Sequence, residues 1–265
     1  MTISSTVIKK TAKTALTNEW VRSIAASVLF LSANLILFLS MGQIGTVFPE
    51  QGVFLTVQFL LSFFLGFPLF MGVLGFFWRI LWGQTDRLTV CFRFFADRRQ
   101  YFRVLKTALF VLLNCVKIGI IAFAPAIILD IFSGETVYTL LGMDKPMWIS
   151  NLWMVSRILK AAALVIVVLI SVRYYAVPFF LLADEEMEPL EVLYFSRKIS
   201  AETWTEFIWL IFSFAPVLLL SLFVVPMIFT LPYLLTSYLV HCRFATAQYN
   251  RGQKGKAENT MAWMR

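Results

Sequence analysis

Residues 171–200, SVRYYAVPFFLLADEEMEPLEVLYFSRKIS, decide the fold of this chain. The stretch begins inside a long apolar run and passes an arginine and a proline. It then reaches an acidic elbow between Asp184 and Glu191, and it ends just before the next apolar run. This order is expected where one helix leaves a bilayer and another prepares to enter it. The stretch therefore predicts a membrane protein whose hairpins are joined by short polar turns.

The composition excludes a soluble fold. Of the 265 residues, 60% are hydrophobic and only 14% are charged, whereas about a quarter of the residues of a soluble domain are charged. The formal net charge is +8, but the lysines and arginines mostly flank apolar runs, as they do in the cytoplasmic loops of membrane proteins. No recognition motif accompanies the charge, so a nucleic-acid partner is not expected.

Apolar runs predict an all-α, polytopic six-helix transmembrane bundle with short interfacial cytoplasmic helices. Residues 1–22 form a basic N-terminal segment, residues 23–249 the transmembrane domain, and residues 250–265 a basic C-terminal tail. A helix needs about 20 residues to cross the bilayer. The predicted crossings are about Ile24 to Met41, Val53 to Trp82, Thr107 to Phe132, Met154 to Leu182, Glu206 to Val224 and Pro226 to Cys242.

The distribution of lysine and arginine sets the predicted orientation. Residues 42–52, GQIGTVFPEQG, contain neither residue type, so the positive-inside rule makes this loop external and both termini cytoplasmic. Arg157 and Lys160 fall on the external side in this scheme and are its weakest point. They are tolerated if their long side chains reach outward to the headgroups.

A basic and aromatic stretch, residues 85–106, follows the second predicted crossing. On a helical wheel its apolar side chains share one side, which predicts either an interfacial helix along the inner leaflet or the lower end of the third crossing. Its cations either contact anionic lipid or a protein partner, or they only set the topology. The SRK segment after the elbow, residues 196–198, adds two further cations. The candidate lipid or partner contacts are therefore Arg93, Arg98, Arg99, Arg103, Arg197 and Lys198.

Two cations lie inside predicted crossings. Lys117 is about three turns into the third crossing, and Arg173 is about three turns before the acidic elbow. Charge at bilayer depth is costly unless it is paired or hydrated. The two side chains either reach along their helices to an interface or define a cavity that attracts anions, with Arg173 paired to Asp184, Glu206 or a backbone carbonyl.

Groups that carry chemistry are sparse. The three cysteines are widely separated, and His241 is the single histidine. We therefore predict no catalytic residue, no metal site and no cofactor. The acidic elbow is expected to be a solvated, helix-capping turn, and an intramembrane lipid enzyme is the least supported class.

The stretches CFRFFADRRQYFRVLKTALF (91–110), RYYAVPFFLLADEEMEPLEVLYFSRKIS (173–200), FSFAPVLLLSLFV (212–224) and LPYLLTSYLVHCRFA (231–245) together suggest a family. They resemble a family of bacterial multipass integral membrane proteins of unknown function. That family is related in pattern to the membrane domain that accompanies some glycerophosphoryl diester phosphodiesterases. The chain departs from the pattern at Glu202 and Thr203, where such proteins often have glycine. The resemblance implies residence in the bacterial cytoplasmic membrane and supplies no reaction, because no phosphodiesterase catalytic domain is present.

Two functions remain open from the sequence. The first is a non-enzymatic membrane component that contacts anionic lipids, acts as a scaffold or maintains the envelope, with a protein partner at the cytoplasmic face. The alternative is a transporter or permease subunit, in which the SRK segment docks a separate ATPase.

Overall fold

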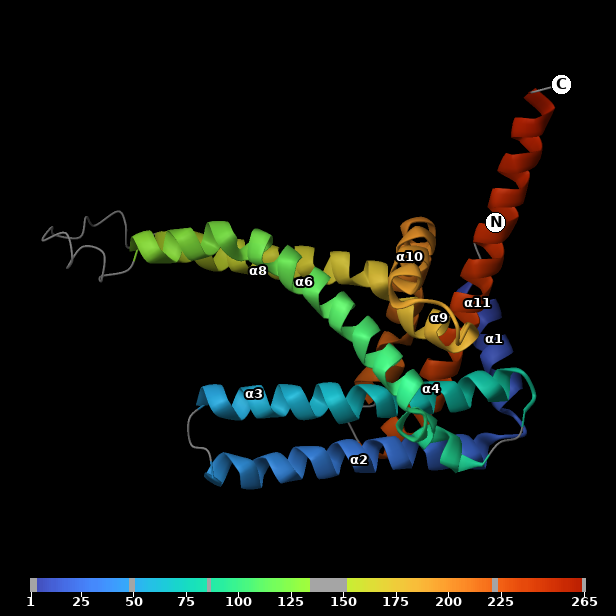
Figure 1. The fold of residues 1–265 in the computed structure, drawn as a ribbon, viewed down its shortest axis with the longest axis horizontal. Coiled ribbons are helices and arrows are strands. Elements are labelled where there is room, and N and C mark those ends of the chain that lie inside the picture. Colours follow the sequence, from blue (N-terminus) through green and yellow to red (C-terminus); the bar gives the residue numbers. More distant parts are fainter. Residues whose placement is uncertain (1–3, 48–50, 85–86, 134–151, 221–223, 264–265) are drawn as a thin grey trace, which may run out of the picture. The chain divides into compact units, whose positions relative to one another are not determined.

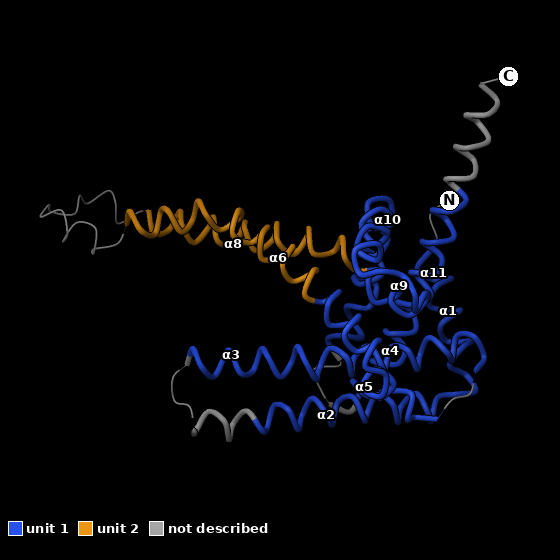
Figure 2. The backbone as a smooth tube through the Cα atoms, in the orientation of Figure 1, with its two compact units in different colours: residues 1–108, 176–265 blue, residues 109–175 orange. Residues whose placement is uncertain are grey.

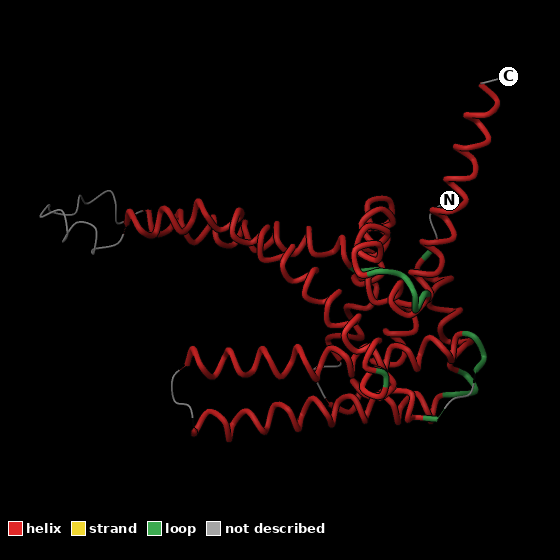
Figure 3. The backbone as a smooth tube through the Cα atoms, viewed as in Figure 1, coloured by secondary structure: helices red, strands yellow, loops and turns green. Residues whose placement is uncertain are grey.

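The chain folds into helices joined by turns (Figure 1). The computed structural model describes residues 4–47, 51–84, 87–133, 152–220 and 224–263, and these residues contain no strand (Figure 3). The α-helices are α1 (Ser5–Leu16), α2 (Trp20–Val47), α3 (Gln51–Leu61), α4 (Phe67–Leu81), α5 (Arg93–Ala96), α6 (Arg98–Ser133), α8 (Leu152–Ser171), α9 (Val177–Ala183), α10 (Pro189–Leu220) and α11 (Val224–Trp263). A π-helical turn η1 (Ser62–Gly66) and 3₁₀ turns η2 (Leu88–Phe92) and η4 (Val172–Tyr174) connect some of them.

Within the described residues, five helical stretches are long and apolar enough to cross a membrane. They are Trp20–Ser40, Gly52–Leu81, Arg98–Ser133, Leu152–Ala183 and Pro189–Leu219. This confirms the predicted all-α, multi-span character. The sixth predicted crossing lies in α11, which is not among the five, so that crossing stays a prediction.

Each of these stretches is divided between an exposed and a buried part. Four of them have 30 to 36 residues, although about 20 suffice for a bilayer. The first part of α6 buries Val104, Leu105 and Ala108, whereas large apolar side chains are exposed from Leu109 to Phe132. Along Trp20–Ser40, Gly52–Leu81 and Leu152–Ala183, most buried side chains likewise lie toward the end that the predicted topology makes cytoplasmic. Along Pro189–Leu219 the buried side chains extend from Val192 to Phe214. Exposed apolar surface on this scale indicates contact with lipid.

The first of two compact units, residues 1–108 and 176–265 (blue in Figure 2), has α4 at its centre. Eight side chains of α4 are buried together with Gly72. A Cβ atom at Gly72 would lie 1.8 Å from the carbonyl oxygen of Cys91, so only glycine lets η2 approach α4 this closely. On another side of α4, the rings of Trp78 and Phe179 meet at 5.1 Å and join it to α9.

Helix α1 packs against α10 and α11 in the same unit. Ile8 and Ala12, four residues apart on one helical face, join Leu210, Phe214 and Val240 in one buried cluster. Residues 1–22 therefore contain a docked amphipathic helix, whereas the sequence predicted only a basic segment.

The second unit, residues 109–175 (orange in Figure 2), pairs α8 with the later part of α6. The two run antiparallel, since the Ser156 hydroxyl donates to the carbonyl of Ala126 at 3.2 Å and Cys115 Sγ lies 3.5 Å from Ser171 Oγ. The segment between the third and fourth predicted crossings, residues 133–151, lies almost entirely outside the described residues.

Two local expectations differ from the structure. The basic stretch is neither one interfacial helix nor wholly the foot of the third crossing. It is interrupted at Asp97, whose carboxylate accepts from the backbone N–H groups of Arg99 at 2.9 Å and Gln100 at 3.4 Å and so starts α6 as an N-cap. The SRK segment is likewise not a separate interfacial helix, because α10 is continuous from Pro189 to Leu220.

Candidate functional site

The acidic elbow is a turn fixed by its own carboxylates. Asp184 accepts from the backbone N–H groups of Glu186 at 2.9 Å and Met187 at 3.3 Å. The Glu191 carboxylate accepts from the Glu188 N–H at 3.3 Å, which is the return bond of a capping box, and Pro189 stands at the first helical position of α10. These bonds account for the acidic residues by local structure, as the sequence predicted.

Arg103 ties the elbow to α6. Its guanidinium donates to the carbonyl oxygens of Asp184 at 2.8 Å and Met187 at 3.3 Å, and also to that of Leu181. These carbonyls belong to the last turn of α9 and to the segment just beyond it, where helical carbonyls lack partners and the helix dipole favours a cation. A single side chain thus supplies three bonds to one chain reversal.

Two more side chains from the same region hold the elbow. Arg93 forms an ion pair with Glu185, and the Gln100 amide donates to the Glu185 carbonyl at 3.3 Å. Two of the predicted lipid or partner contacts, Arg93 and Arg103, are therefore engaged by the elbow. The sequence did not indicate this role, because the residues involved are 78 to 92 positions apart.

The other four predicted contacts are exposed, and two of them lie near exposed aromatic side chains. The Arg98 guanidinium lies 5.7 Å from the centre of the Phe102 ring, and the Lys198 ammonium lies 4.5 Å from that of Tyr194. Phe102 and Tyr194 are 54% and 55% exposed, which leaves each ring with an open face beside a cation. We call the following set the aromatic–basic residues: Phe92, Phe95, Arg98, Arg99, Phe102, Tyr194, Arg197 and Lys198.

Lys117 and Arg173 both belong to the second unit and are exposed. Lys117 lies on the part of α6 whose large apolar side chains are exposed. Arg173 lies in η4, where α8 ends and the chain turns toward α9. Whether they define an anion-attracting cavity stays a prediction.

Arg157 and Lys160, the two cations on the predicted external side, both have partners. Lys160 forms an ion pair with Asp130 of α6, and the Ser156 hydroxyl donates to the same carboxylate. The Arg157 guanidinium lies 3.8 Å from the centre of the Trp153 ring. Sequence reasoning missed Asp130. The available signal was a single acidic residue near the end of one apolar run and basic residues near the start of the next.

Comparisons of the chain with protein families, with curated proteins and with solved structures find no match. The functional interpretation therefore depends on the chemistry of the residues described above.

Proposed function

We propose that the protein is a non-enzymatic, six-span component of the bacterial cytoplasmic membrane with both termini in the cytoplasm. Its aromatic–basic residues contact anionic lipid headgroups of the inner leaflet. In this role it acts as a lipid-interacting scaffold or envelope-maintenance protein.

The division of each long stretch into an exposed and a buried part supports the membrane arrangement. The exposed apolar parts suit the hydrocarbon, and the buried ends form a protein core beneath it. The surplus length of Gly52–Leu81, α6 and α10 over a single crossing supplies residues for that core. Both the buried ends and most of the lysines and arginines fall on the side that the positive-inside rule makes cytoplasmic.

The observation that carries lipid contact is the pairing of exposed cations with exposed rings. Arg98 with Phe102 and Lys198 with Tyr194 each combine a cation with an exposed aromatic ring. The amphipathic ring of tyrosine favours the headgroup level of a membrane. A lysine or arginine near an anionic surface contributes about 1 kcal/mol of attraction.

The test is a lipid titration in mild detergent, followed by the thermal unfolding midpoint. Phosphatidylglycerol should raise the midpoint of the wild-type protein more than zwitterionic phosphatidylcholine does, because a ligand that binds the folded state stabilises it. The double variants R98Q/R99Q and R197Q/K198Q should each need roughly 30-fold more phosphatidylglycerol for the same effect, from about 1 kcal/mol per cation.

The matched control is K13Q/R22Q, which removes two exposed cations of the N-terminal segment. This variant should respond to phosphatidylglycerol nearly as the wild type does. An equal response of the wild-type protein to the two lipids, or an equal loss in the control, would refute the proposal.

A further inference from the structure

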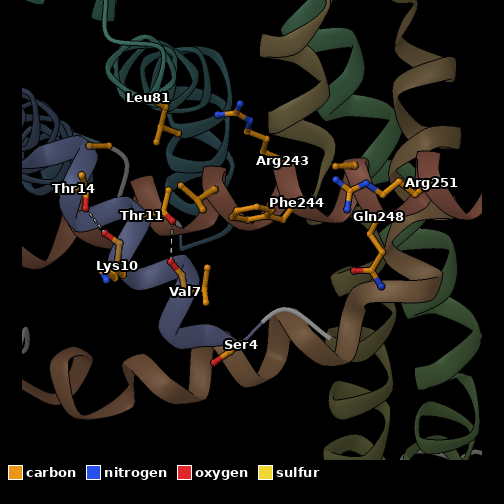
Figure 4. Close-up of a pocket in the computed structure, with 13 residues that line it drawn as sticks. Ser4, Val7, Lys10, Thr11, Thr14, Leu81, Arg243, Phe244, Gln248 and Arg251 are labelled. Atoms are coloured by element: carbon orange, nitrogen blue, oxygen red, sulfur yellow. Dashed lines mark hydrogen bonds between the residues drawn. The ribbon is translucent and has the colours of Figure 1, made fainter. Parts of the chain in front are cut away.

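A groove with a volume of about 1490 Å³ lies between α1 and α11 in the first unit (Figure 4). One wall is the outward face of α1, which includes Val7, Lys10 and Thr14. The other is the face of α11 that presents Phe244 and Gln248, and Leu81 closes one end. Pockets for drug-sized molecules measure about 300 to 1,000 Å³, so this groove suits a longer, extended ligand.

The α1 wall is held in place by contacts on its opposite face. The Lys9 ammonium donates to the carbonyl of Ser213 at 2.7 Å and lies 4.4 Å from the centre of the Phe214 ring. Pro216 follows inside α10 and has no N–H to give to the preceding turn. Lys9 therefore contacts the backbone of α10 in a turn that proline weakens. Because this contact holds one face of α1 against α10, the other face lines the groove.

The groove is strongly cationic. Lys10, Arg243 and Arg251 line it, and no acidic side chain does so among the described residues. The Arg243 guanidinium lies 4.4 Å from the centre of the Trp82 ring. Three cations without a counter-charge in the lining attract an anion, and guanidinium groups match phosphate oxygens in geometry.

One polar atom in the groove has an unmet hydrogen-bonding requirement. The side-chain oxygen of Gln248 is buried and has no hydrogen-bond partner within the described part of the chain. Such an atom is costly unless a donor reaches it. The hydroxyls of Thr11 and Thr14 do not supply one, because each donates to a carbonyl of its own helix at 3.0 Å.

The groove also has an apolar side. Figure 4 shows Phe244 reaching from α11 toward α1, and Val7, Leu81 and Val240 complete this lining. Val7 is 50% exposed although it is a large apolar side chain. Cations, an unsatisfied acceptor and an apolar strip within one groove are the features that an anionic amphiphile requires.

We infer that this groove binds one anionic phospholipid. The phosphate lies among Lys10, Arg243 and Arg251, a hydroxyl or ammonium of the headgroup donates to Gln248, and an acyl chain lies along Phe244. The inference rests on the proposed membrane role, but it adds a single stoichiometric site that is separate from the aromatic–basic residues.

The test measures the phospholipid retained by the purified full-length protein in native mass spectrometry, after addition of phosphatidylglycerol. The wild type should retain one phospholipid per chain. K10Q/R251Q should need roughly 30-fold more lipid for the same occupancy, about fivefold for each cation. A247W, which fills the groove without changing its charge, should lose the bound lipid and still unfold at the wild-type temperature.

Two controls establish whether the groove holds the retained lipid. K13Q/R22Q removes two exposed cations outside the groove and should keep the lipid. Displacement of the lipid by excess inorganic phosphate would show a free-anion site and overturn the lipid assignment, as would full retention in K10Q/R251Q or A247W.

The aromatic–basic variant R98Q/R99Q distinguishes this inference from the proposed function. This variant should keep the single bound lipid, whereas phosphatidylglycerol should raise its thermal unfolding midpoint less than that of the wild type. If the unfolding midpoint of the wild type responds normally to phosphatidylglycerol but no bound lipid is retained, only the groove assignment is overturned.

Discussion

Replacing Arg103 with glutamine should loosen the connection between α6 and the acidic elbow. The side chain donates to the carbonyls of Leu181, Asp184 and Met187. A hydrogen bond to a charged group contributes roughly 1.5 to 3 kcal/mol. The guanidinium is only partly buried, so water takes over some of this bonding. We expect a loss of about 2 to 4 kcal/mol in the free energy of unfolding.

The assay is thermal unfolding in detergent, where about 1 kcal/mol corresponds to roughly 2 to 4 °C for a chain of this size. R103Q should therefore unfold roughly 4 to 16 °C below the wild type. R103K keeps the charge but loses the planar fork of donors, and it should recover only part of the difference. The matched control is R99Q, an exposed arginine four residues away, which should change stability by less than about 0.5 kcal/mol. If R103Q and R99Q unfold at the same temperature, the structural role of Arg103 is refuted.

Three further changes test other contacts. Gly72→Ala puts a methyl group 1.8 Å from the Cys91 carbonyl oxygen and should lower the free energy of unfolding by more than about 4 kcal/mol. Its control is Gly119→Ala, which has open space around it and should raise that free energy by about 0.5 to 1 kcal/mol. Thermal unfolding measures both. Asp130→Asn leaves Lys160 without its ion-pair partner and should destabilise by about 1 to 3 kcal/mol, while adding Lys160→Met should restore most of the loss in a double-mutant cycle. Burial raises the pKa of the Cys91 thiol to about 11. In a variant that retains only this cysteine, maleimide labelling should be very slow at pH 7, and its rate should rise about tenfold per pH unit until the pH nears that pKa. Fast labelling at neutral pH would contradict the burial.

The long apolar helices were predictable because their signal is local. An apolar run of sufficient length, flanked by lysine or arginine, identifies a crossing without knowledge of any partner. The start of α6 at Asp97 also had a local signal, since an aspartate three residues before Gln100 is typical of an N-cap. The continuity of α10 through the SRK segment had another, because residues 200–205 contain neither glycine nor proline.

The contacts that build the candidate sites depend on residues far apart in the chain. Nothing around Gly72 indicates that the backbone of Cys91 passes within van der Waals range, and nothing near Arg103 indicates three carbonyl acceptors beyond α9. Ile8, Ala12 and Leu16 show the spacing of an amphipathic face. Their partners on α10 and α11 are not visible in the sequence, so the groove beside α1 could not be predicted either.

The docking of α1 has a consequence for biosynthesis. Lys9 meets Ser213 across 204 positions of sequence, so α1 is made long before α10 and α11, which bury its apolar face. A cysteine introduced at Ala12 should therefore react in ribosome-bound chains that end before α10 and become protected when the chain is complete. Before α10 and α11 are made, α4 is a contacting helix already available to α1, through Leu81, and the later pair α10 and α11 completes the burial of its apolar face.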